Sequence, residues 1–138
     1  MFPARMVALA DAFDFASRFC STHGVDRDDA LRLKLVVEEL FTNTVRHGHG
    51  IESDATIRIA LAFAPGGIAI VYEDEAPGFD PTRGMTLARA APEAPPAMHA
   101  VGGLGLRLLG EIVRDLRYVR VAGRNRLSLT LPRIAPPG

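Results

Sequence analysis

The spacing of apolar residues divides the first third of the chain into two helices. Pro3 suits a first helical turn, and the apolar positions that follow recur with a helical period until Gly24. A second helical pattern begins at Asp26, whose side chain suits an N-cap, and continues to about His47, with Gly48 suited to the C-terminal cap. We therefore predict a pair of helices ahead of any strand.

Alternating apolar positions predict two hairpins in the rest of the chain, separated by a long segment without a clear period and by a third helix. The predicted strands are Thr56–Phe63, Ile68–Glu73, Tyr118–Ala122 and Arg126–Leu131, and the third helix is Gly103–Leu116. This order predicts an α+β two-layer sandwich, in which a mostly antiparallel sheet is covered on one face by helices.

The chain has 138 residues, the length of one domain. We expect residues 1–138 to form that single domain, with a short tail at residues 132–138. Residues 74–101 are rich in proline and alanine and have no clear period. An unpatterned segment of this length inside a compact domain is usually functional. We interpret residues 79–101, as approximate bounds, as a lid that closes over a bound ligand.

The composition argues against several kinds of protein. A net charge of zero and a single cysteine, Cys20, argue against a dedicated nucleic-acid binder, a disulfide framework and a multi-cysteine metal site. No apolar run is long enough to cross a membrane and no signal-peptide pattern is present, so we expect a cytoplasmic protein that binds no membrane. The seven arginines between Arg107 and Arg133 are interpreted as solvated surface. The single lysine, Lys34, does not lie in a P-loop motif.

Three polar side chains on the second helix form the first candidate site. Glu39, Asn43 and His47 are spaced four residues apart and fall on one border of the apolar arc, whereas Glu38 falls on the other border. A carboxylate placed as a base beside an amide oxygen that can bind a hard cation is the functional interpretation. The alternative is a polar flank whose groups pair locally. The pattern does not separate a pocket role for His47 from a packing role.

Two loop segments are further candidates. Asp74 ends a predicted strand, where its carboxylate can accept a hydrogen bond from a ligand amino group, and Gly78 permits a tight turn after it. A glycine-rich stretch then leads into the third helix, where backbone N–H groups at a helix start can hold phosphate; its residues are Gly102, Gly103, Leu104 and Gly105. An acidic turn and an ordinary helix entry are the alternatives.

Taken together, the three segments resemble the nucleotide-binding boxes of the Bergerat-fold ATPases, which include gyrase, histidine kinases, mismatch-repair ATPases and certain chaperones. The matching motifs are Glu39-x-x-x-Asn43-x-x-x-His47-Gly48, Asp74-x-Ala76-x-Gly78-Phe79-Asp80-Pro81 and Gly103-Leu104-Gly105-Leu106. The short chain and its Gly123-Arg124-Asn125-Arg126-Leu127 segment are more narrowly similar to the anti-sigma-factor serine kinases of bacteria. The resemblance covers about residues 5–131.

The resemblance implies a Bergerat ATP-binding fold and a role for each matching residue. Glu39 would be the general base, and Asn43 would bind a Mg²⁺ ion that bridges the phosphates. Asp74 would accept a hydrogen bond from the adenine amino group, and Gly78 would shape the pocket beneath the base. The glycines of the third box would present backbone N–H groups to the phosphates of ATP.

The resemblance also implies a function. The chain would be an ATP-binding anti-sigma factor that phosphorylates a small antagonist protein on serine or threonine and regulates transcription by alternating between that antagonist and a sigma factor. Members of the family often form homodimers. Ala76 stands where the family usually has glycine, and it favours the alternative of an ATP-binding regulatory module with weak or no kinase turnover. Asn125 lies in the region where the family often has a threonine that supports the adenine site.

Overall fold

The computed structural model describes residues 1–45, 55–75 and 109–133. The helices are a 3-10 turn at Met6–Ala8, α1 at Leu9–His23 and α2 at Arg27–Asn43. Residues 109–112 are also helical. The strands are β1 at Phe2–Pro3, β2 at Thr56–Ala64, β3 at Gly67–Asp74, β4 at Arg114–Val121 and β5 at Arg124–Pro132. Among these residues, no helix has the length and apolar character needed to cross a bilayer.

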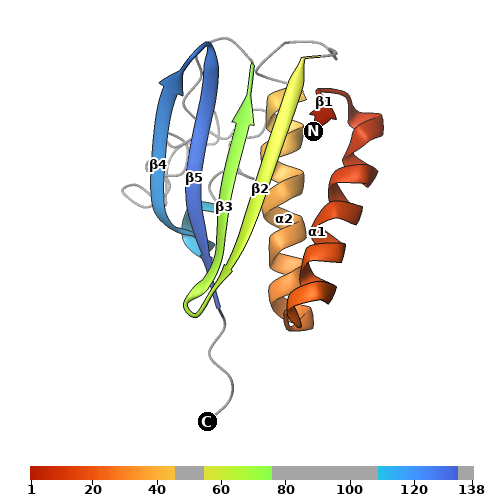
Figure 1. Cartoon of the computed structure of the whole chain (residues 1–138), viewed down its shortest axis with the longest axis vertical. Coiled ribbons are helices and arrows are strands. Elements are labelled where there is room, and N and C mark those ends of the chain that lie inside the picture. The colour runs from red at the N-terminus through yellow and green to blue at the C-terminus, as the bar shows by residue number, and fades with distance from the viewer. Residues whose placement is uncertain (46–54, 76–108, 134–138) are drawn as a thin grey trace, which may run out of the picture.

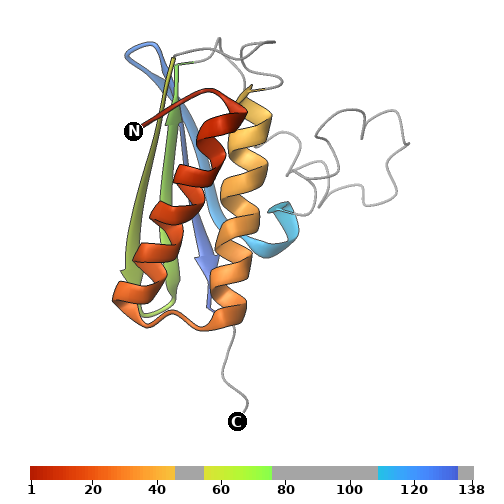
Figure 2. The same ribbon diagram turned by 90° about the vertical axis from the view of Figure 1, so that its right-hand side faces the viewer.

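The strands form one sheet in the order β1-β2-β3-β5-β4, and each neighbouring pair is antiparallel. Helices α1 and α2 lie side by side on one face of this sheet (Figure 1; Figure 2). The predicted α+β two-layer architecture is confirmed. The strand pair that places the site is β3 and β5, because Asp74 at the end of β3 is opposite Asn125 at the start of β5.

The two central strands bury alternate residues against the helices. On β3 these are Ile68, Ile70 and Tyr72, and their partners on β5 are Leu131, Leu129 and Leu127. Because side chains of a strand alternate between faces, the next inward position on each strand belongs to Asp74 and Asn125. The same alternation that builds the core therefore directs two polar side chains to its end.

Helix α1 packs against α2. Small side chains make up a buried face of α1 and of the turn before it: Ala8, Ala12, Ala16 and Cys20 recur every four residues and are buried. Burial raises the pKa of the Cys20 thiol above its ordinary value of 9.0, which keeps it protonated at neutral pH. Cys20 is thus a free, buried thiol.

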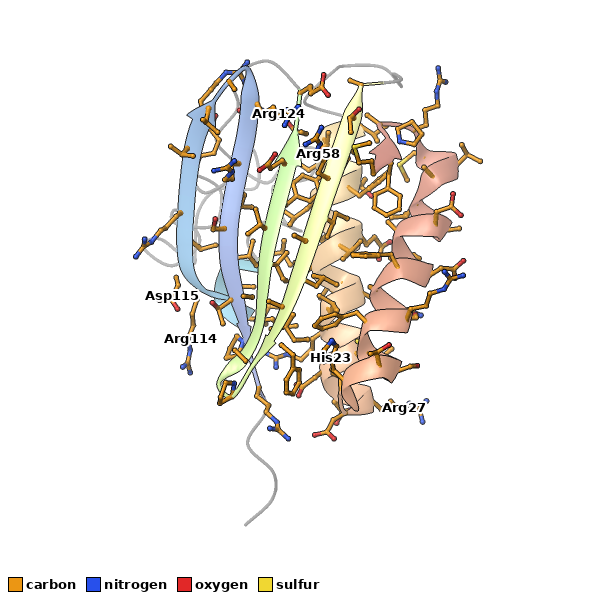
Figure 3. All side chains as sticks on the ribbon, in the orientation of Figure 1. His23, Arg27, Arg58, Arg114, Asp115 and Arg124 are labelled. Carbon is orange, nitrogen blue, oxygen red and sulfur yellow. The ribbon has the colours of Figure 1, made fainter. Side chains whose placement is uncertain are left out.

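Both predicted helix boundaries near residue 25 are confirmed. Gly24 ends α1 with a φ of 63°, the left-handed conformation that glycine adopts without strain. Asp26 is the N-cap residue of α2, although its side chain makes no capping hydrogen bond. Beside this junction the ring of His23 stacks on Phe63 of β2, with ring centroids 5.6 Å apart (Figure 3).

The C-terminal end of the predicted third helix is wrong. A helical pattern through Leu116 was expected, but the helix ends at residue 112 and β4 begins at Arg114. Pairing with β5 overrides the local period, because Arg114 lies opposite Thr130 and a bulge separates it from Arg117. Asp115 lies in this irregularity with a φ of 56°. Strand β5 also continues through Pro132, the first residue of the predicted tail.

Candidate functional site

A small pocket, with a cavity volume of about 10 Å³ among the described residues, lies at the end of the sheet where α2 ends, β3 ends and β5 begins, the upper end in Figure 1. The described residues that line it are Leu40, Asn43, Thr44, Tyr72, Asp74, Tyr118, Asn125 and Leu127. Apolar walls with a few polar groups directed inward are the usual composition of a small-molecule site.

Asp74 is the acidic residue of this pocket, and it is 8% exposed. The hydroxyl of Thr44 donates to its Oδ2 over 2.9 Å, and the Nδ2 group of Asn125 donates to its Oδ1 over 2.8 Å. Two neutral side chains thus fix the carboxylate plane from opposite sides. Since each carboxylate oxygen has two lone pairs, Asp74 keeps capacity to accept a further hydrogen bond from a ligand.

Tyr72 extends the contacts on the α2 side of the pocket. Its Oη atom lies 2.6 Å from Thr44 Oγ1 and 3.1 Å from the carbonyl oxygen of Leu40. Burial raises the pKa of the Tyr72 phenol well above its ordinary value of 10.0, so it carries its proton at neutral pH. Each hydroxyl has one hydrogen to donate. If Thr44 donates its hydrogen to Asp74, Tyr72 is therefore the donor in the hydrogen bond between Tyr72 and Thr44.

On the β5 side, Asn125 is held by two residues of β4. The Tyr118 hydroxyl donates to Asn125 Oδ1 over 2.5 Å, and the Nη1 group of Arg120 donates to the same oxygen over 3.0 Å. Strand pairing brings these groups together, since Tyr118 lies opposite Leu127 and Arg120 opposite Asn125. A chain of donors therefore runs from β4 through Asn125 to Asp74.

The end of α2 supplies the second polar wall. Asn43 is buried and lines the pocket, so its amide lies in the same space as the Asp74 carboxylate. Glu39 lies one turn earlier and is partly exposed, outside the described residues that line the pocket, while Glu38 is exposed. Thr44 and Val45 continue the helix in π-helical form.

An ion-pair cluster lies on the other face of the sheet, directly behind Asp74. Glu73 accepts from Arg126 Nε over 2.7 Å, and Arg124 Nη1 lies 3.7 Å from its second oxygen. Arg58 of β2 is opposite Glu73 in register, and Figure 3 shows Arg58 and Arg124 at the same end of the sheet. The cluster ties β5 to β3 next to the site, so two of the C-terminal arginines do more than cover the surface.

The structure places Asn43 and Asp74 in one pocket. Several predicted site residues and the predicted lid lie outside the described residues; these site residues are His47, Ala76, Gly78, Gly102, Gly103, Leu104 and Gly105. Thr44, Tyr72 and Tyr118 line the pocket but were not predicted from the sequence. A signal for Thr44 was present, because it is a polar residue four positions after Leu40 on the buried arc of the helix.

Two comparisons with known proteins agree with this geometry. A model of the histidine kinase-like ATPase domain family matches residues 2–131. The serine/threonine-protein kinase BtrW of Bordetella bronchiseptica is 32% identical over 100 residues, which cover 71% of this chain and 67% of that relative. The family match spans all the strands and helices described above except Pro132, the last residue of β5.

Proposed function

Because the chain belongs to the histidine kinase-like ATPase domain family, we propose that it is an anti-sigma factor that binds ATP and phosphorylates a small antagonist protein on serine or threonine. The similarity to a serine/threonine-protein kinase supports the choice of a hydroxyl as the acceptor. Phosphorylation of the antagonist would release it from this chain. This chain would then bind a sigma factor, so the antagonist and the sigma factor would alternate as partners of one domain.

The observation that carries the proposal is the buried Asp74 carboxylate, held by Thr44 and Asn125 in the pocket at the end of the sheet. Such a carboxylate accepts hydrogen bonds and does not donate them, so it suits the exocyclic amino group of adenine. The apolar side chains of Leu40 and Leu127 line the same pocket and suit the faces of a flat base.

Asn43 is the residue that we propose for Mg²⁺. Its amide lies in the pocket and can offer a hard oxygen ligand. Among the described residues, no group of three or more His, Cys, Asp or Glu side chains could hold a metal ion. A single protein ligand fits Mg²⁺, which often binds through one or two protein oxygens together with phosphates and water. The ion would neutralise phosphate charge.

Glu39 is proposed as the general base. Its position one turn before Asn43 on α2 would put a carboxylate beside the phosphate end of the nucleotide. It would take the proton of the incoming serine hydroxyl as the oxygen bonds to the γ-phosphorus and ADP leaves. In the same proposal Gly78 shapes the base pocket, the loop of Gly102, Gly103, Leu104 and Gly105 holds the phosphates, and His47 lines the site.

Transfer of labelled phosphate from Mg-ATP to a candidate antagonist tests the proposal. The wild-type protein should form phosphoserine or phosphothreonine, and Glu39→Gln should lower the transfer rate by roughly 100-fold or more while ATP still binds. Glu38→Gln, on the exposed side of the same helix, is the matched control and should transfer normally. Equal rates for wild type and Glu39→Gln would refute the role of Glu39.

Tight ATP binding without transfer to any partner would select the alternative of a regulatory ATP-binding module. Ala76 is the feature that favours this alternative, because an alanine at a position that needs a positive φ costs about 1 kcal/mol or more. Ala76→Gly should then strengthen ATP binding.

A further inference from the structure

A groove with a cavity volume of about 350 Å³ lies between α1 and α2, at the end of the helices opposite the Asp74 pocket. It opens away from the sheet, because Leu31 and Lys34 line it whereas Leu33 and Val36, which are buried in the core, fall on the other side of α2. A hollow of this volume has room for side chains of another molecule.

Small side chains on α1 leave the space for this groove. Ser17 and Ser21 are exposed on its α1 wall, and Cys20 and Ala30 lie deeper between the helices. On the α2 wall, Leu31 is 55% exposed. A leucine open to water beside a hollow with an apolar floor is a contact surface for an apolar side chain from outside.

A cation stands towards each end of the groove. Arg27 and Lys34 both line it and are seven residues apart on α2, so they share one face of the helix with a rise of about 10 Å between them. Figure 3 shows Arg27 at the lower end of the two helices, directed outward. The Lys34 ammonium lies 5.9 Å from the centre of the Phe13 ring, so it reaches across to α1. In the part of the chain that the structure describes, neither cation forms an ion pair.

The groove therefore carries positive charge at two separated points. Among the described residues no acidic side chain lines it, since the nearest acids along the two helices, Asp14, Asp28 and Glu38, stand outside the lining. The spacing of the two cations suits two carboxylates on one extended ligand better than a single small anion.

We propose that this groove binds an acidic amphipathic helix of a partner protein, in which two carboxylates about 10 Å apart flank an apolar side chain. Docking of the apolar face of a helix into a groove is a recurring mode of protein recognition. The proposal goes beyond the proposed function, because the groove shares no lining residue with the Asp74 pocket and lies at the other end of α2.

An α-helix presents the complementary pattern when two acidic residues seven positions apart have a leucine between them, since these positions share one face. The two carboxylates would pair with Arg27 and Lys34, and the apolar side chain would cover Leu31 and enter the hollow. The hydroxyls of Ser17 and Ser21 on the opposite wall would donate to polar groups at the edge of the bound helix.

NMR titration of the isotope-labelled full-length protein with a synthetic peptide tests the proposal. The probe is a capped helical peptide of about 16 residues, built on alanine and glutamine, in which two glutamates seven positions apart flank two leucines. Backbone amide signals of the residues that line the groove should shift and saturate with a Kd below about 1 mM. The affinity should fall as the salt concentration rises.

Two further peptides show whether the pattern, and not charge alone, is recognised. One has glutamines in place of the glutamates, and the other has the same composition in an order that spreads glutamates and leucines around the helix. Each should bind at least about threefold more weakly than the probe. Equal binding of the reordered peptide would overturn the proposal, because it would show attraction between charges without a matched face.

Protein variants test the named contacts. Arg27→Gln and Lys34→Gln should each weaken binding of the probe by about two- to fivefold, the range expected for an exposed ion pair. Leu31→Ser should weaken it by about threefold or more through lost apolar contact. The matched control is Arg18→Gln, because Arg18 is an exposed arginine of α1 outside the lining of the groove. It should leave the affinity unchanged.

Three results would overturn the proposal: no saturable binding of the probe, shifts that fall outside the groove, or an equal loss of affinity in Arg18→Gln and Lys34→Gln. All of these would leave the proposed function standing, since Lys34→Gln should bind ADP as wild type does. Failure of wild type to bind ATP would refute the proposed function and leave the groove proposal intact. Thermal unfolding of each variant shows that a lost affinity does not come from a lost fold.

Discussion

In the described part of the chain, two aspartates are buried, Asp29 and Asp74; they lie at opposite ends of the sheet and are held in different ways. Asp29 is 5% exposed and Asp74 is 8% exposed, and each lines a small pocket. Asp29 lies in the first turn of α2, where the helix dipole favours a negative charge. Its Oδ1 atom also lies 3.4 Å from the guanidinium of Arg32.

The contacts around Asp29 stabilise the fold. Arg32 donates to the carbonyl oxygens of Pro132 and Ile112, over 3.0 and 3.4 Å, so it joins α2 to the end of β5 and to the helix before β4. At the other end, the neutral side chains of Thr44 and Asn125 donate to Asp74. Two aspartates with similar burial thus have different contacts: Asp29 pairs with a guanidinium that joins three elements, and Asp74 accepts from two neutral side chains in the proposed ligand site.

The largest difference between the two aspartate-to-asparagine variants is expected in nucleotide binding. Asp74→Asn should weaken ADP binding by roughly 10- to 100-fold, because a hydrogen bond to a charged acceptor is lost and an amide donor faces the base. Asp29→Asn should change the affinity by less than about twofold, since the pocket that it lines is at the other end of the sheet. Calorimetric titration measures both, and comparable losses would break the proposed division of roles.

When the free energy of unfolding is measured, Asp29→Asn should have a larger effect than Asp74→Asn. Asp29→Asn should lower the free energy of unfolding by about 1–2 kcal/mol, because it removes both an ion pair and a favourable interaction with the helix dipole. Asp74→Asn should lower it by less than about 1 kcal/mol, since its amide can donate to Thr44 Oγ1 while Thr44 donates to Leu40. Urea unfolding followed by circular dichroism measures both. A larger loss for Asp74→Asn would show that its network is chiefly structural.

Much of the fold and part of the Asp74 end could be predicted from local patterns. Asp74 and Asn43 were found because each follows or borders a strong apolar pattern, at a strand end and on a helix flank. Thr44 and Tyr72 were missed because a hydroxyl among buried apolar residues looks like ordinary core in a periodicity analysis. Asn125 was noted only as the residue in place of an expected threonine, and its hydrogen bond to Asp74 depends on strand pairing across 51 positions.

The errors in element boundaries have the same cause. Strand β1 pairs only Phe2 and Pro3 with β2, and two residues have no period to detect. Residues 114–116 continue a helical pattern in the sequence, but the structure places them in β4, because pairing with β5 is a long-range interaction that the local pattern does not contain. Long-range pairing therefore accounts for both the wrong end of the third helix and the missed contact between Asn125 and Asp74.

The Asp74 end of the sheet, which contains Tyr72, should also make the stability depend on alkaline pH. Burial raises the pKa of Tyr72, so above pH 10 the unfolded chain loses this proton while the folded protein keeps it. The stabilisation is fully present below pH 10, and it should fall by about 1.4 kcal/mol per pH unit as the pH rises from 10 towards the folded pKa. The difference in unfolding free energy between wild type and Tyr72→Phe, measured at pH 8, 10 and 11, isolates this contribution because every other residue is the same in both proteins. A constant difference would contradict the raised pKa.

The smallest effect is expected at Asp26, which shares the α2 N-terminus with Asp29. An N-cap aspartate that bonds the helix usually contributes about 1 kcal/mol, but the Asp26 side chain makes no capping hydrogen bond. Its backbone carbonyl accepts from Ala30 over 2.8 Å, a contact that any residue can make. Asp26→Ala should therefore lower the free energy of unfolding by less than about 0.5 kcal/mol, against about 1–2 kcal/mol for Asp29→Asn. Both are measured by urea unfolding at neutral pH. A loss for Asp26→Ala as large as that for Asp29→Asn would mean that negative charge anywhere in the first turn stabilises this end, and the specific contact between Asp29 and Arg32 would lose its assigned role.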